Sequence, residues 1–96
     1  MATGLGEKRL KEILSAMYRI QMYHFFPEEV MPQLMKECNL SEEEAIQLVR
    51  AFISRGWLNT SGFLPRYFLR PGYISCFPVI ISAAGLNYLK EKSFSP

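Results

Sequence analysis

The strongest local signal in the sequence is the stretch Leu40–Leu58, which predicts one helix with both of its ends specified. Ser41 is a good N-cap, and Glu44 stands three residues later, where its carboxylate can reach back to the backbone N–H of the cap. Glu42 and Glu43 complete an acidic first turn, where the helix dipole favours negative charge. The helix therefore begins at a defined residue.

The same stretch carries one apolar stripe and a clear stop. The stripe recurs at the i, i+3, i+4, i+7 spacing of an amphipathic helix and consists of Ala45, Leu48, Val49, Phe52 and Ile53. Gly56 is well placed to end the helix in a left-handed conformation. Trp57-Leu58 follows at once, and we expect it to start a strand.

Length and composition indicate one domain. The 96 residues are enough for a single hydrophobic core, and an apolar fraction of 49% with a charged fraction of 21% is ordinary for a globular chain. We expect a single domain over residues 1–96, with frayed ends at about 1–6 and 93–96. Five of the six residues 7–12 are charged, where a secretory signal would be apolar, and the longest uncharged run, 71–89, is interrupted by proline, glycine and asparagine. We expect no membrane span and a cytoplasmic location.

The side chains that carry most chemistry are scarce. Cys38 and Cys76 belong to no metal-binding pattern and His24 is the only histidine, so a zinc site is not expected. Both cysteines are expected to be small core residues in a reducing compartment. The chain has no aspartate, no glycine-rich phosphate loop and no paired catalytic carboxylates. We therefore expect neither an enzyme nor a bound cofactor or metal.

Three further helices and a second strand complete the expected elements. Apolar spacing and helix-end signals place them at Glu7 to about His24, Glu28–Cys38, Val79–Ile81 and Ser82–Lys92. Within the second of these helices we expect regular geometry from about Met31, because a proline at position 32 is tolerated only near a helix start. Asn39 is expected to take the positive φ of a tight turn.

This element order, with a long turn-rich connection between the two strands, resembles a winged helix-turn-helix domain of small bacterial or phage type. Leu40–Leu58 is similar to the capped recognition helix, glycine and aromatic-apolar pair of such domains. Val79–Lys90 is similar to the strand and helix start that follow their wing. The resemblance implies an α+β fold with a three-helix core, a two- or three-stranded β wing and a C-terminal helix.

The resemblance also implies a function. The helix from Ser41 would lie in the major groove of double-stranded DNA, and the wing would reach the backbone. Gln and Arg on its outward face suit adenine and guanine edges, while arginines of the wing would contact phosphate. The implied DNA-binding residues are Gln47, Arg50, Ser54, Arg66 and Arg70. The protein would be a small transcriptional regulator acting as a homodimer.

Charge leaves alternatives open. Residues 1–48 carry five basic and eight acidic side chains (net −3), whereas residues 49–96 carry six and one (net +5). The basic half favours a polyanion, but Glu42, Glu43 and Glu44 would oppose phosphate at the helix start. The outward stripe is equally explained as a solvated helix face. A protein–protein interaction module, with the acidic helix start and the aromatic connection 63–77 as its surface, is the main alternative, and an RNA or single-strand binder is a third.

Overall fold

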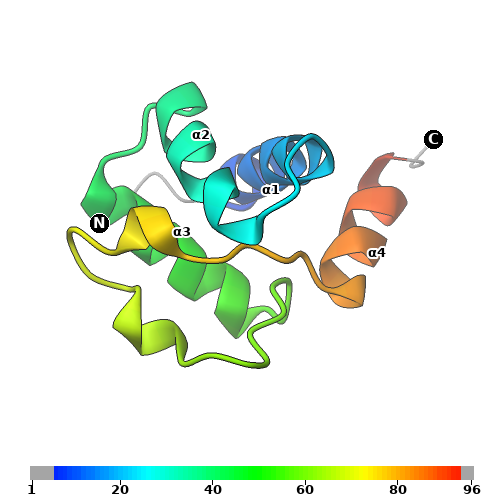
Figure 1. Cartoon of the computed structure of the whole chain (residues 1–96). Helices are drawn as coiled ribbons and strands as arrows, with labels where there is room; N and C mark the ends of the chain where they lie inside the picture. The colour runs from blue at the N-terminus through cyan, green and yellow to red at the C-terminus, as the bar shows by residue number, and fades with distance from the viewer. Residues whose placement is uncertain (1–5, 94–96) are drawn as a thin grey trace.

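The computed structural model describes residues 6–93, excluding the side chains of 91–93, and it is helical (Figure 1). The expected frayed ends fall mostly outside this range. The helices are α1 (Glu7–Met22), α2 (Val30–Glu37), α3 (Glu42–Ser54) and α4 (Ala83–Ser93). Three short 3-10 turns lie between them: η1 (Pro27–Glu29), η2 (Pro65–Tyr67) and η3 (Ile74–Cys76).

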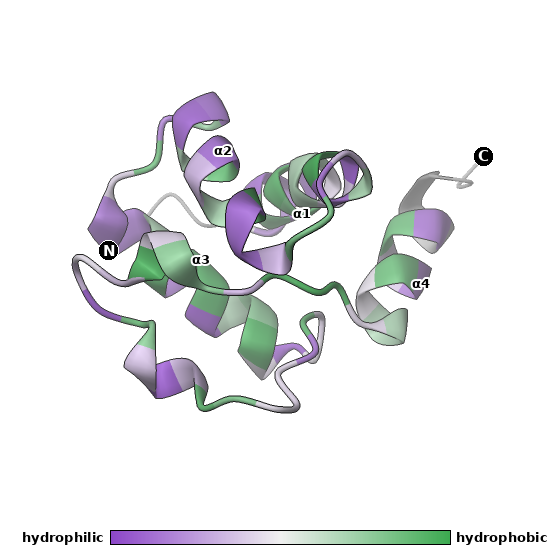
Figure 2. Cartoon of the chain, viewed as in Figure 1, coloured by the Kyte–Doolittle hydropathy of each residue, from purple (hydrophilic) through white to green (hydrophobic). Residues whose placement is uncertain are grey.

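One apolar cluster joins helices α1, α2 and α3 to the segments 57–58 and 74–81. Hydrophobic residues recur between hydrophilic ones along α1 and α3, as in helices that turn one face to a core (Figure 2). Most of the predicted α3 stripe is buried and Ile53 is half-buried, whereas Tyr18 and Met22, expected on the apolar face of α1, are exposed. The largest fully buried side chains include Phe52, Phe77, Met17 and Leu48. No charged or polar side chain is buried among residues 6–90, so the core is held by apolar packing.

The ends of α3 and the turn before it are confirmed in detail. Ser41 Oγ accepts from the N–H of Glu44 at 3.1 Å, and the Glu44 carboxylate accepts from the N–H of Ser41 at 2.9 Å, which completes the capping box. Asn39 has φ 55° and Gly56 has φ 75°, the left-handed conformations expected after α2 and α3. After α3, the N–H of Trp57 donates to the carbonyl of Phe52 at 2.9 Å, so the chain reverses as in a Schellman motif.

The bounds of the first two helices differ slightly from prediction. α1 stops at Met22, two residues before the expected end. α2 starts at Val30, directly after η1, so Pro32 is its third residue instead of its first. This position is still in the first turn, where a backbone N–H has no partner within the helix and its loss costs little.

The predicted α+β winged-helix class is wrong, because residues 6–93 contain no β-sheet. The two expected strands meet in a single antiparallel bridge between Leu58 and Ile81. The N–H of Asn59 donates to the carbonyl of Ile80 at 2.7 Å, and the N–H of Ser82 donates to the carbonyl of Trp57 at 2.8 Å. Pairing does not extend beyond this contact, so the described part of the chain forms no β wing.

The hydrogen bonds of the 79–81 segment explain why no strand forms. The N–H of Val79 donates to the carbonyl of Pro27 at 3.1 Å, and the N–H of Ile81 donates to the side-chain oxygen of Gln21 at 2.9 Å. These donors are therefore satisfied by α1 and η1 and not by a neighbouring strand. In the connection 63–77, prolines at 65 and 71 lack donors, and the chain folds into η2 and η3 instead of a hairpin.

α4 closes the fold as expected, capped by Ser82, whose Oγ accepts from the N–H of Gly85 at 3.1 Å. Gly85 is the one fully buried residue of the helix between 83 and 90 and lies against the backbone of Trp57. Tyr88 stacks on the Trp57 ring with centroids 4.3 Å apart. Leu86 and Leu89 also pack against the core, and α4 lies beside α1 at the edge of the molecule (Figure 1).

Candidate nucleic-acid interface

Three of the five implied DNA-binding residues lie on one groove. Gln47 and Arg50, on the outward face of α3, line it together with Arg70 from the connection 63–77. Its volume is about 630 Å³, and Glu43, Ile46, Leu69 and Pro71 complete the lining. Ser54 and Arg66 are exposed but do not line the groove.

The arginines divide into two groups by their partners. Three of them form ion pairs: Arg9 with Glu12, Arg19 with Glu37, and Arg55 with Glu7. Among the side chains that the structure describes, the other three, Arg50, Arg66 and Arg70, have no carboxylate within ion-pair distance. We call these three residues the arginine surface. All three are among the residues that were predicted from the sequence to contact DNA.

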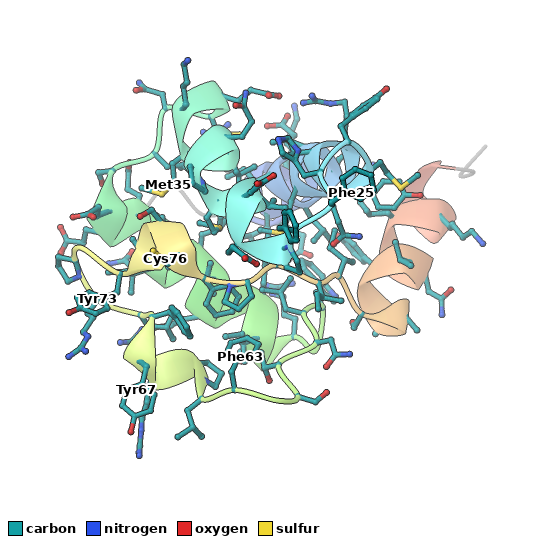
Figure 3. All side chains as sticks on the ribbon, viewed as in Figure 1. Phe25, Met35, Phe63, Tyr67, Tyr73 and Cys76 are labelled. Carbon is teal, nitrogen blue, oxygen red and sulfur yellow. The ribbon has the colours of Figure 1, made fainter. Side chains whose placement is uncertain are left out.

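Two guanidinium groups of the arginine surface rest on tyrosine rings. The Arg70 guanidinium lies 4.4 Å from the ring centroid of Tyr73, and that of Arg66 lies 5.7 Å from the ring centroid of Tyr67. Both tyrosines are exposed and lie on the same side of the molecule (Figure 3). A guanidinium on an aromatic face is held in position, while its N–H edge remains available to an anion.

The acidic start of α3 has structural roles that sequence reasoning only partly found. Glu44 belongs to the capping box, as expected. Glu42 Oε2 accepts from the backbone N–H of Gly72 at 2.9 Å, thirty residues away, and so fastens the connection 63–77 to α3. This contact was missed because nothing in the spacing of the two residues indicates it. Glu43 lines the groove and places a negative charge beside Arg50 and Arg70.

The aromatic residues of the connection are mostly internal. Phe63, Phe68 and Phe77 form a cluster of edge-to-face rings with centroids 5.4–6.1 Å apart. Phe77 is fully buried and the other two are half-buried. These phenylalanines therefore do not form the exposed stacking or partner surface considered from the sequence, and Tyr67 and Tyr73 are the exposed aromatic rings of this segment.

The remaining reactive side chains form no second site. His24 Nδ1 lies 2.9 Å from the carbonyl oxygen of Ile20, as a helix-end residue. Cys38 is half-buried, and its burial raises the pKa of the thiol. Cys76 is exposed, contrary to the expectation of a core residue. Among the described side chains, no three histidines, cysteines or carboxylates gather as metal ligands would.

No protein-family model, curated protein or solved structure matches the chain. Within residues 6–93, none of the helices combines the length and the apolar content that crossing a bilayer requires. The groove must therefore be interpreted from the chemistry of its own residues.

Proposed function

We propose that the protein binds double-stranded DNA through the arginine surface and acts as a small, non-catalytic transcriptional regulator in the cytoplasm. The observation that carries this proposal is the partition of the arginines. Arg50, Arg66 and Arg70 have no carboxylate partner among the described side chains, whereas the other three do. Unpaired, ring-supported guanidinium groups are suited to phosphate, which they bind in a bidentate fashion.

The arrangement of α2 and α3 supports a major-groove contact. The two helices are joined by the four residues 38–41 and pack with α1 around one core, so α3 presents its outward face on a rigid support. On that face Gln47 would pair with adenine and Arg50 with guanine. Arg66 and Arg70, with the hydroxyl of Ser54, would contact phosphate and fix the register.

The carboxylates at the start of α3 limit the affinity that we propose. Glu42 and Glu44 accept hydrogen bonds from backbone N–H groups, and Glu43 lies on the groove itself. Close approach of phosphate at this end is unfavourable. We therefore propose that the DNA backbone is contacted at the Arg66–Arg70 side, and that a homodimer adds the affinity that one copy lacks.

Fluorescence anisotropy with labelled duplex DNA, over a series of salt concentrations, tests the proposal. We expect binding that weakens steeply with salt, and a salt slope that falls by about 0.9 for each phosphate contact removed, as in Arg70→Ala. Arg50→Ala is expected to cost about 1–3 kcal/mol, mainly on the preferred sequence. Lys8→Ala, which removes one positive charge from an exposed position of α1, is the matched control.

Two results would contradict the proposal. One is no binding of the wild-type protein even at low salt. The other is an equal loss of affinity in Lys8→Ala and Arg70→Ala, since this would reduce the interaction to net charge alone.

A further inference from the structure

The end of α1 carries an exposed apolar cluster that the proposed DNA contact does not use. Met22, Tyr23, Phe25 and Phe26 are 64%, 82%, 97% and 57% exposed. We call these four residues the aromatic end. Phe25 lies on the side of the molecule that carries α4 (Figure 3). Isolated exposed apolar residues are common, but four large ones within five positions place an unusual amount of exposed apolar area at one end of α1.

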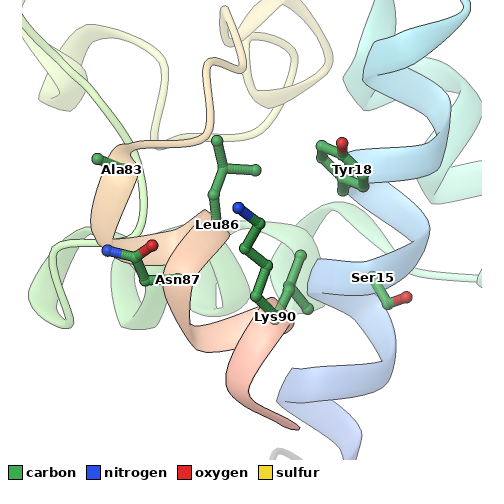
Figure 4. A pocket seen from close by; sticks show the side chains of 7 residues that line it. Ser15, Tyr18, Ala83, Leu86, Asn87 and Lys90 are labelled. Carbon is green, nitrogen blue, oxygen red and sulfur yellow. The ribbon is translucent and has the colours of Figure 1, made fainter. Parts of the chain in front are cut away.

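An apolar groove adjoins this patch. It lies between α1 and α4 and has a volume of about 490 Å³. Tyr18 of α1 faces Leu86 and Lys90 of α4 across it, and Ser15 of α1 also lines it (Figure 4). Met22 follows Tyr18 by four residues on the same face of α1, so the groove and the aromatic end are continuous.

We propose that a second copy of the chain covers this region, with Phe25 of each protomer inserted into the α1–α4 groove of the other. A projection and a hollow on the same side of one molecule can satisfy each other about a two-fold axis, where every contact occurs twice. The groove is of the size at which proteins bind apolar groups. The same operation buries the half-exposed Leu86 of both copies.

The exposed area of the aromatic end can be compared with the area that a dimer requires. At about 150–250 Å² for each large side chain, the aromatic end exposes roughly 450–750 Å². The largest apolar patch of an ordinary monomer is about 300–600 Å², and a stable interface covers about 800 Å² on each partner. The aromatic end alone falls short of this area, and the walls of the groove, with Tyr18 and Leu86, would supply the remainder.

Charge is also complementary across the proposed interface. Glu28 and Glu29 follow the aromatic end after Pro27 and are exposed. Lys90 is exposed at the groove, and none of the three has an ion pair among the described side chains. Insertion of Phe25 would bring the carboxylates of one copy towards the ammonium of the other, which orients the partner.

The interface leaves the arginine surface free. Tyr67 and Tyr73, which support Arg66 and Arg70, lie at the opposite side of the view from Phe25 (Figure 3). A dimer formed through the aromatic end would therefore present two such surfaces. The dimer itself does not depend on DNA binding and can be tested without DNA.

Sedimentation equilibrium of the purified chain over a range of concentrations measures the association. We expect a mass that approaches twice 11.1 kDa for the wild type. Phe25→Ser removes the projection, and Ser15→Arg blocks the groove with a long charged side chain at an exposed position. Each is expected to weaken the dimer at least about 30-fold, as loss of a central aromatic contact does. Leu64→Ser, at an exposed site in the connection, is the control and should leave the dimer unchanged.

A mixture of the two variants gives the decisive result. Phe25→Ser retains a groove and Ser15→Arg retains a projection, so only their heterodimer has one intact contact. We expect the mixture to associate more strongly than either variant alone, with circular dichroism showing that both are folded. A monomeric wild type at every concentration would overturn the proposal, and so would a dimer that survives Phe25→Ser or a mixture no stronger than its components.

Discussion

Substitution of Gly85 by alanine tests how α4 is held on the rest of the fold. In an exposed helix this change stabilises by about 1 kcal/mol, because alanine is the better helix former. At position 85 a Cβ would lie 2.7 Å from the carbonyl oxygen of Trp57 and 2.8 Å from Cγ2 of Ile81. The first of these atoms belongs to the backbone and also accepts the N–H of Ser82, so it cannot move freely.

The size of the effect follows from three contributions. Overpacking against fixed atoms costs about 1–3 kcal/mol. If α4 shifts to relieve the clash, the stack of Tyr88 on Trp57 is weakened, which costs about 0.5–1.5 kcal/mol more. The gain of about 1 kcal/mol in helix propensity offsets part of this. We expect Gly85→Ala to lower the free energy of unfolding by about 0.5–3.5 kcal/mol.

Urea unfolding followed by tryptophan fluorescence measures both parts of this prediction. Trp57 is the only tryptophan, so its native emission reports directly on the Tyr88 stack. Ala84→Gly, at the exposed neighbouring position, is the matched control and should cost up to about 1 kcal/mol without changing the emission. An increase in stability for Gly85→Ala, with unchanged emission, would refute the close approach of α4 to Trp57.

Three further predictions concern ionisation and capping. The hydrogen bond and charge of Arg19 lower the pKa of Glu37. This pair therefore stabilises the fold above the ordinary pKa of glutamate, and the stabilisation is lost as pH falls through the lowered pKa. Arg19→Gln should raise the pKa of Glu37, as NMR titration can measure. Burial raises the pKa of the Cys38 thiol, so iodoacetamide should modify Cys38 more slowly than the exposed Cys76, as peptide mass spectrometry can measure. Ser41→Ala removes the capping box and should cost about 1 kcal/mol in urea unfolding.

The features of α3 were predictable because the interactions that define them are local. The capping box joins residues three apart, and the turn at Gly56 uses hydrogen bonds over three to five residues. Backbone sterics at Asn39 and Gly56 depend on those residues themselves. Such interactions can be predicted from a few consecutive residues.

The strand at 79–81 was predicted from the same kind of window, and there the prediction failed. β-branched residues favour extended backbone, but a strand also needs a partner that satisfies its donors. The partners here are Pro27 and Gln21, which lie more than fifty positions earlier in the chain. The prediction of strand pairing at Val79 and Ile81 was therefore wrong beyond the single bridge at Ile81.

The arginine surface also shows that charge can be counted from the sequence, whereas ion pairs between distant residues cannot be predicted from it. The excess of positive charge in residues 49–96 was visible in the sequence, but it included Arg55, which pairs with Glu7 across 48 positions. Removing Arg55 from the set leaves Arg50, Arg66 and Arg70 as the unpaired guanidinium groups among the described side chains. Two of them share the groove with Gln47. Tertiary pairing therefore removes Arg55 from the candidate charges of this half, and it leaves Arg50 and Arg70 beside the outward face of α3, with Arg66 outside the groove and Lys90 on α4.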